Sequence, residues 1–151
     1  MNDDVVERAL WALRAYDALA LATVSALGPH VAGVYFAPEA GDGGVRLIIA
    51  TLRDTRVQRD MRADPRVAFM CSPGNASRWI QGAGSAAMVD AAAEASVLLD
   101  RLVAHSPAAT TFAEQRGVVA GVISVQRLKI VEAPEAPPLQ LSFASDSKKS
   151  G

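Results

Sequence analysis

Residues 45–67, VRLIIATLRDTRVQRDMRADPRV, decide the fold that this sequence predicts. Residues 45–50 form a short apolar run rich in β-branched side chains, which is typical of a buried strand. Asp54 or Thr55 then offers a side chain that can cap a helix, and Pro65 ends that helix. The segment therefore predicts a strand, a turn and the N-terminus of a short helix.

Polar side chains suited to phosphate surround this predicted junction. The first turn of a helix exposes unpaired backbone N–H groups at the positive end of the helix dipole. The hydroxyls of Thr51 and Thr55 and the guanidinium groups of Arg53 and Arg56 lie within a few residues of that end. Hydroxyl and guanidinium groups are good donors to phosphate oxygens. The junction is therefore a candidate phosphate site.

A second interpretation explains the same arginines as ordinary surface. Arg56, Arg59 and Arg62 recur every three residues, and Asp60 and Asp64 lie between and after them. Charges at such helical spacing commonly pair with each other on a solvated face. The spacing alone leaves both interpretations open.

The composition indicates one globular domain. The chain has 151 residues, of which 50% are hydrophobic and 21% charged, enough to build a normal core. The formal net charge of -1 provides no field that would attract nucleic acid or an anionic membrane. We therefore expect no nucleic-acid partner and no membrane partner.

Cysteine and histidine are too sparse for a disulfide framework or a metal site. Cys71 is the only cysteine, and His30 and His105 are far apart in the sequence. The N-terminus lacks the pattern of a secretory signal, and no apolar run reaches membrane-spanning length. We predict no metal and a cytoplasmic location.

The rest of the chain predicts hairpins with inserted helices. Apolar spacing and turn residues predict an amphipathic helix over 2–16 and a helix over 91–104, the latter placing Val97, Leu98, Leu102 and Val103 toward the core. Strands are predicted at 19–25, 30–36, 45–50, 66–71, 79–90 and 121–131, with a turn over 38–44 and glycines in the fifth strand that indicate a bulge or close approach.

These elements predict an α+β fold, a six-stranded antiparallel split β-barrel of Greek-key type with flanking helices. The domain is expected over residues 1–133, followed by a flexible C-terminal tail over 134–151 that is rich in proline and then in serine and lysine. Several strands lack a polar face, so a helix or another subunit must cover them, and we expect a homodimer.

In this order, the elements resemble the flavin-binding split-barrel family related to pyridoxamine 5′-phosphate oxidase. The resemblance is carried by ALATVSALGPHVAGVYF at 20–36, LIIATLRDTRVQRDMRADPRVAF at 47–69 and RWIQGAGSAAMV at 78–89. It implies a homodimer that holds flavin mononucleotide at the subunit interface, with the cofactor phosphate at the strand-to-helix junction. The candidate cofactor-binding residues are Ala50, Thr51, Arg53, Thr55, Arg56, Trp79 and Gln81.

The junction departs from the family pattern at two places. Family members read roughly Thr, three residues, then Ser/Thr-Arg-Lys, which Thr51, Thr55 and Arg56 match, whereas Val57 stands in place of the lysine. The oxidases also carry an arginine near positions 32–33, where this chain has Ala32 and Gly33. Two cations that would face the phosphate are therefore absent, and Arg53 is a candidate to compensate.

Trp79 and Gln81 lie on the strand that in similar proteins approaches the flavin or the partner subunit. An indole can stack on a ring system, and an amide can hydrogen-bond a ring edge. An ordinary core or interface role explains Trp79 equally well, and a surface role explains Gln81.

The resemblance implies a flavin mononucleotide-dependent oxidoreductase in which the flavin carries hydride or electron transfer to a small molecule. A deazaflavin-dependent reductase is an alternative. A non-enzymatic protein that holds flavin or haem in the same cleft is another, and haem would need an axial ligand such as His30 or His105. A structural dimer without cofactor is the last.

Overall fold

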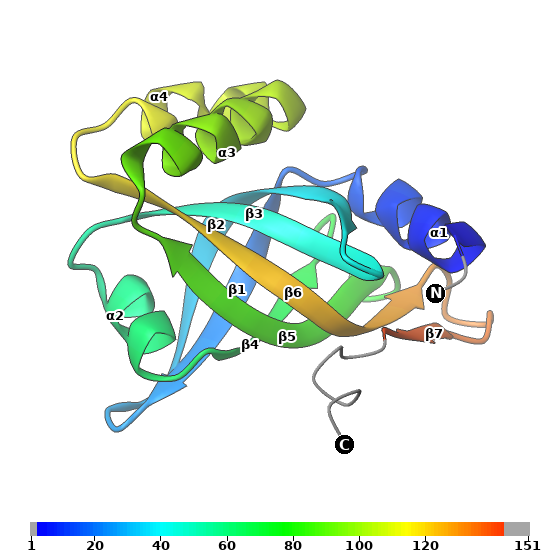
Figure 1. Cartoon of the computed structure of the whole chain (residues 1–151). Helices are drawn as coiled ribbons and strands as arrows, with labels where there is room; N and C mark the ends of the chain where they lie inside the picture. The colour runs from blue at the N-terminus through cyan, green and yellow to red at the C-terminus, as the bar shows by residue number, and fades with distance from the viewer. Residues whose placement is uncertain (1–2, 144–151) are drawn as a thin grey trace, which may run out of the picture.

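The computed structural model describes residues 3–143 and has an α+β architecture (Figure 1). No helix within that range is long and apolar enough to cross a membrane. The elements are α1 (Asp3–Leu13), β1 (Ala18–Ser25), β2 (Gly28–Gly41), β3 (Gly44–Leu52), α2 (Arg56–Ala63), β4 (Arg66–Cys71), β5 (Trp79–Val89), α3 (Ala92–His105), the 3-10 turn η1 (Pro107–Ala109), α4 (Thr110–Ala113), β6 (Val118–Val131) and β7 (Leu139–Ser142).

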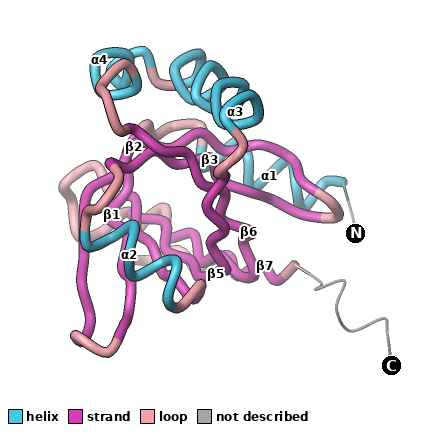
Figure 2. Tube along the Cα trace, turned by 60° about the vertical axis from the view of Figure 1, so that its left-hand side comes forward, coloured by secondary structure: helices cyan, strands magenta, loops and turns pink. Residues whose placement is uncertain are grey.

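The strands form one antiparallel sheet that closes on itself. Their order is β3-β2-β1-β4-β5-β6-β7, and β3 also pairs with β6, so that β1 to β6 form a ring. Closure gives each of these six strands two neighbouring strands, although β2 pairs with β1 over residues 28–35 and with β3 over residues 36–41. α3 and α4 lie over one side of the ring, and α2 lies at the end where β3 finishes (Figures 1 and 2).

The described sheet has seven strands, one more than the sequence predicts. β7 pairs with β6 in the register Arg127↔Ser142 to Ile130↔Leu139. The prediction of a tail from residue 134 is therefore wrong for residues 139–142, and residues 144–151 lie outside the described part of the chain. β7 is only four residues long and follows a proline-rich connection, so its sequence carries little strand signal.

β2 is longer than predicted and runs through most of the expected turn at 38–44. Pro38 pairs with Leu47, and the chain reverses only after Gly41, with Gly43 at φ +74°. Pro38 is tolerated because the pairing of β2 with β1 ends at Tyr35, which leaves Pro38 with a partner strand on one side only.

The core consists of two layers separated by the sheet. Leu47 and Ile49 of β3 point into the ring, whereas Ile48 and Ala50 on the opposite face pack against α3. This double burial explains why β3 has no polar face, since a helix covers its outer side. α3 contributes Leu98 and Leu102 to the outer layer, as predicted, but Val97 is 50% exposed, which corrects its predicted core position.

Glycines in β5 allow close contact with β6. A Cβ on Gly84 would lie 2.2 Å from the backbone oxygen of Ser124, and the register shifts between Ala83 and Gly84. The predicted bulge and the predicted close approach are therefore both confirmed, and no larger residue fits at position 84 without moving backbone.

Candidate functional site

A pocket of about 520 Å³ opens where β3 ends and α2 begins, and we name it the β3–α2 pocket. Its walls come from the start of β1, from β2, from the end of β3, from the first turn of α2 and from α4. Four of the seven predicted cofactor-binding residues line it, namely Ala50, Thr51, Thr55 and Arg56. The pocket therefore lies at the strand-to-helix junction that the sequence predicts.

Thr51 presents a buried hydroxyl that the described protein leaves unpaired. Its backbone pairs with Val119 of β6, which fixes its position, and the residue is only 3% exposed. Its Oγ1 has no hydrogen-bond partner among the described residues. A buried unpaired hydroxyl costs about 1–3 kcal/mol, so an acceptor on a bound ligand would offset that cost.

Thr55 occupies the N-cap position of α2 without capping it through its side chain. Its backbone is extended, with φ −78° and ψ 159°, but Oγ1 donates to the backbone oxygen of Leu52 at 2.8 Å. The predicted side-chain cap by Asp54 or Thr55 is therefore absent from the described structure. The N–H groups of the first turn of α2 remain without a side-chain acceptor, which suits an anionic ligand.

Arg56 reaches the pocket from the first residue of α2. Its Nη2 donates to the backbone oxygen of Gly28 at 3.1 Å, and its Nε lies 3.5 Å from Oδ2 of Asp60. About a third of the side chain, 32%, stays exposed, so the guanidinium can still meet a ligand. Arg56 thus holds the β1–β2 turn through a hydrogen bond and also places a positive charge at the pocket.

Asp60 is a buried carboxylate beneath this cation. It accepts a hydrogen bond of 2.9 Å from Thr23 Oγ1 and is 3% exposed. Burial by itself would raise the pKa of Asp60, but hydrogen bonds from Thr23 and Ser25 and the nearby Arg56 outweigh burial and lower that pKa. Asp60 therefore remains ionised at neutral pH.

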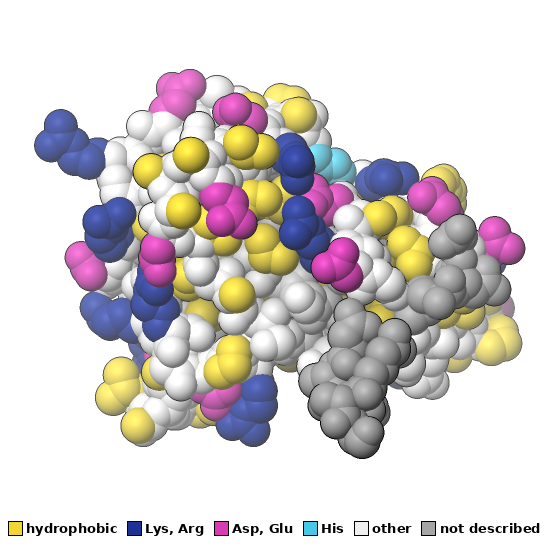
Figure 3. All heavy atoms as spheres, viewed as in Figure 1, with side chains coloured by type: hydrophobic (Ala, Val, Ile, Leu, Met, Phe, Trp, Pro, Cys, Tyr) yellow, Lys and Arg dark blue, Asp and Glu magenta, His cyan; other side chains and the backbone are white. Residues whose placement is uncertain are grey.

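The remaining arginines of α2 belong to the surface. Arg59 Nη1 donates to the backbone oxygen of Asp54 at 2.7 Å, and Arg62 pairs with Asp90 at 2.6 Å. In Figure 3 the basic side chains gather along the edge where Figure 1 places α2, with acidic side chains among them. The surface interpretation thus holds for Arg59 and Arg62, and the pocket interpretation holds for Arg56.

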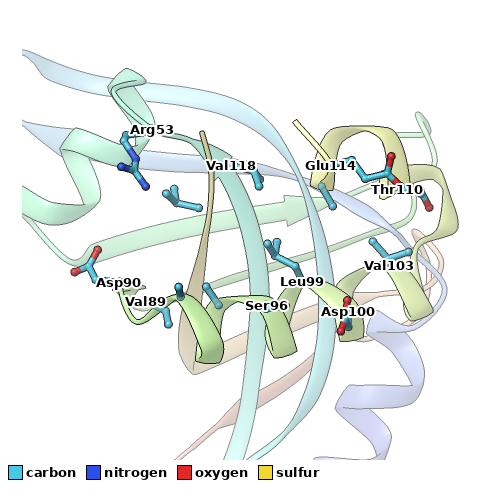
Figure 4. Close-up of a pocket in the computed structure, with 14 residues that line it drawn as sticks. Arg53, Val89, Asp90, Ser96, Leu99, Asp100, Val103, Thr110, Glu114 and Val118 are labelled. Carbon is cyan, nitrogen blue, oxygen red and sulfur yellow. The ribbon is translucent and has the colours of Figure 1, made fainter. Parts of the chain in front are cut away.

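Arg53 does not join the β3–α2 pocket. It lines a different pocket of about 480 Å³ beside α3 and α4, which we name the α3–α4 pocket. Figure 4 shows its side chain entering that pocket on the side where Asp90 lies. Arg53 thus lies outside the lining of the β3–α2 pocket, and its compensation for the missing phosphate cations stays a prediction.

Trp79 and Gln81 also lie away from the β3–α2 pocket of their own chain. Trp79 is the first residue of β5. Val89, at the other end of β5, pairs with Ala120 of β6, whose neighbour Val119 pairs with Thr51 of the pocket. Trp79 Nε1 donates to Gln81 Oε1 at 2.8 Å, and Trp79 borders a third pocket together with Trp11. Within one chain, the residues expected to bind the phosphate and the pair expected to contact the flavin ring, Trp79 and Gln81, are therefore not brought together.

Several residues that line the β3–α2 pocket are not among the candidates predicted from the sequence. Phe112 reaches the pocket from α4, and its ring lies 6.0 Å from that of Tyr35, centroid to centroid. Gly33 lines the pocket, and a Cβ built on it would meet no atom within 4 Å. A contact between residues far apart in the sequence, such as that of Phe112 with Tyr35, leaves no local sequence pattern. The small residues at 32–33 are a local pattern, and they indicate open space beside β2.

The remaining reactive groups differ in their access to the pocket. His30 lines it, whereas His105 is engaged elsewhere, with Nε2 2.9 Å from the backbone oxygen of Tyr16. Burial raises the pKa of the Cys71 thiol to about 12, so this thiol stays protonated and unreactive. Val57, in place of the expected lysine, is 6% exposed and packs in the inner core.

Comparison with known families covers most of the chain. Residues 7–132 match the family model described as pyridoxamine 5′-phosphate oxidase. No curated protein sequence matches the chain.

Solved structures share the fold at low sequence identity. A putative pyridoxamine 5′-phosphate oxidase from Listeria innocua has a TM-score of 0.64 and 14% identity, covering 85% of this chain and 99% of its own. The heme binding protein from Mycobacterium smegmatis has a TM-score of 0.70 and 17% identity, covering 94% of this chain and 59% of its own. The heme storage protein HutZ from Vibrio cholerae has a TM-score of 0.60 and 17% identity, covering 91% and 94%. At these identities the likeness establishes the fold.

Proposed function

Because this chain belongs to the pyridoxamine 5′-phosphate oxidase family, we propose that it binds flavin mononucleotide in the β3–α2 pocket and acts as an oxidoreductase on a small molecule. The observation that carries the proposal is the buried hydroxyl of Thr51, which lines the pocket and lacks a partner among the described residues. Flavin supplies hydride or electron transfer when it is bound.

The residues at the end of β3 fit a phosphate group. Thr51 offers an unused donor, and the first turn of α2 offers backbone N–H groups that no side chain caps. Arg56 adds one positive charge at the same place. With Val57 in place of a lysine and no cation at positions 32–33, we propose that Arg56 alone provides the charged contact.

The apolar part of the pocket fits a planar ring. Gly33 leaves free space on the β2 wall, and Phe112 with Tyr35 closes the side toward α4. These apolar walls orient a ring and exclude water from one of its faces. A deazaflavin would make the same contacts with phosphate and ring, so binding assays must include it.

Trp79 and Gln81 would complete this site from a second copy of the chain. Both lie at the far end of β5 from the pocket, so one chain does not supply them to its own ligand. We propose a homodimer in which each copy places this pair beside the pocket of the other. Sedimentation analysis tests this arrangement, and a monomer that retains full flavin affinity would contradict it.

Paired variants test the phosphate assignment. The double variant Thr55→Ala, Arg56→Ala should weaken flavin mononucleotide binding by well over tenfold, because it removes the pocket cation and leaves the carboxylate of Asp60 unpaired near the phosphate. Arg59→Ala is the matched control, since Arg59 lies on the same helix but bonds the backbone of Asp54 on the surface. Equal affinity in the double variant and in the control would reject the assignment.

Haem is a second candidate ligand for the same pocket. His30 lines the pocket and is a possible axial ligand, and proteins of this fold include one titled a heme binding protein and one titled a heme storage protein. Haemin titration of the wild-type protein and of His30→Ala tests this candidate. A Soret shift that disappears in His30→Ala supports haem, and the absence of any shift in the wild type removes it.

A further inference from the structure

The β3–α2 pocket has one fixed positive charge, and a buried negative charge lies directly behind it. Arg56 is the only Lys or Arg among the described residues that line the pocket. Asp60 Oδ2 lies 3.5 Å from Arg56 Nε, and this ion pair has little water around the carboxylate, which is 3% exposed. Buried pairs are screened far less than surface pairs.

Asp60 is held in this position from the opposite side. Thr23 of β1 donates to the same Oδ2 atom at 2.9 Å, so the carboxylate cannot rotate away from Arg56 without losing a buried hydrogen bond. The lowered pKa of Asp60 agrees with a permanently ionised group at neutral pH. Asp60 therefore places a fixed negative charge beside the cation that a ligand meets at Arg56.

We propose that Asp60 sets the ligand selectivity of the β3–α2 pocket by offsetting the charge of Arg56, so that the pocket takes flavins with or without a phosphate. This inference rests on the proposed flavin site. A phosphate facing an arginine without an opposing carboxylate typically gains at least tenfold in affinity from each charge-assisted hydrogen bond. In this chain, the dianionic phosphate meets Arg56 and the field of Asp60 together, and its net gain over a neutral ribityl chain is small.

Asp60→Asn provides the test, because asparagine keeps the shape and an oxygen acceptor for Thr23 but removes the negative charge. Dissociation constants for flavin mononucleotide and for riboflavin are measured by flavin fluorescence at low ionic strength. In the wild type we expect the two constants to differ by less than about tenfold. In Asp60→Asn we expect flavin mononucleotide to bind about tenfold more tightly, with riboflavin unchanged.

Asp64→Asn is the matched control. Asp64 follows the same helix and loses the same charge, but it pairs with the exposed Arg66 at 2.6 Å and does not line the pocket. We expect both dissociation constants to stay at their wild-type values in this variant. Equal tightening in Asp60→Asn and Asp64→Asn would mean that only net charge matters and would overturn the proposal.

The outcomes separate this inference from the flavin site itself. If neither flavin binds the wild type, the proposed function fails and the inference fails with it. If flavins bind but Asp60→Asn leaves the ratio of the two constants unchanged, only the inference is overturned. If Asp60→Asn does not fold, the wild-type ratio of the two constants decides: a preference for flavin mononucleotide below about tenfold supports the offset charge, and a larger preference contradicts it.

Discussion

Thr23 Oγ1 donates a hydrogen bond of 2.9 Å to Oδ2 of Asp60 and so joins β1 to α2 inside the protein. The same carboxylate lies 3.5 Å from Arg56 Nε, and Arg56 in turn bonds the backbone oxygen of Gly28 in the β1–β2 turn. The start of α2 is therefore fixed to the hairpin by one buried and one part-buried hydrogen bond. Such contacts set the orientation of the pocket before a ligand arrives.

The unpaired hydroxyl of Thr51 gives a prediction with opposite effects on stability and binding. Thr51→Val keeps the side-chain volume and removes a buried group without a described partner. We expect the free energy of unfolding to rise by about 1 kcal/mol, because the desolvation cost of the hydroxyl disappears. Affinity for flavin mononucleotide should fall severalfold. Urea unfolding and fluorescence titration measure the two effects.

Thr55→Val is the control for that change. The Thr55 hydroxyl donates to the backbone oxygen of Leu52 at 2.8 Å, so its removal should lower the free energy of unfolding by about 0.5–1.5 kcal/mol. If Thr51→Val destabilises the protein as much as Thr55→Val does, then Thr51 has a structural partner and its role at the pocket is in doubt.

The two faces of α3 should respond differently to truncation. Leu102 is fully buried in the outer core layer, and Leu102→Ala should cost about 2–5 kcal/mol through lost burial and a residual cavity. Val97 is 50% exposed, and Val97→Ala should change the free energy of unfolding by less than about 0.5 kcal/mol. Chemical denaturation of both variants checks the orientation of α3, which a similar loss in each would contradict.

Gly33→Val tests the pocket without disturbing the fold. A Cβ at position 33 meets no atom within 4 Å, and valine is favourable in a strand, so thermal stability should stay near that of the wild type. The added side chain occupies space in the β3–α2 pocket and should weaken flavin binding about tenfold, or about 1.4 kcal/mol. Unchanged affinity in a folded Gly33→Val protein would place the ligand elsewhere.

Asp64 gives the protein a defined sensitivity to acid. Hydrogen bonds from the Arg66 side chain and backbone lower the pKa of Asp64 from 3.8 to about 2. Because the folded pKa is below the unfolded pKa, this group adds stability at neutral pH, and that stability is lost as pH falls from about 5 toward 2. The stability curve of Asp64→Asn should therefore fall less steeply across that window. Parallel curves for wild type and variant would contradict the low pKa.

Local patterns predict most of the fold, and the errors have physical causes. β3 and α2 follow from a β-branched run that gives way to polar residues and from Pro65 after the helix, although the predicted side-chain cap does not form. β7 has four residues and depends on its pairing with β6, so propensity alone does not indicate it. Val97 is one residue before Leu98 and five before Leu102, so it lies beside the stripe of α3 that packs on the outer core layer.

The site is predictable only where it is local in sequence. Ala50, Thr51, Thr55 and Arg56 lie within seven consecutive positions and meet at one pocket. Arg53 belongs to the same stretch, yet the turn directs it to the α3–α4 pocket, because neighbouring positions around a turn face different sides. The contribution of Phe112 depends on the packing of α4 over the sheet, which no motif encodes.

The central claim is that the β3–α2 pocket binds a flavin, and an absorbance spectrum from 300 to 500 nm tests it most directly. The purified protein is titrated with flavin mononucleotide, then separately with a deazaflavin and with haemin. We predict a saturable change in the flavin band with quenched flavin fluorescence. A flavin spectrum that stays identical to that of the free cofactor at every protein concentration would contradict the account.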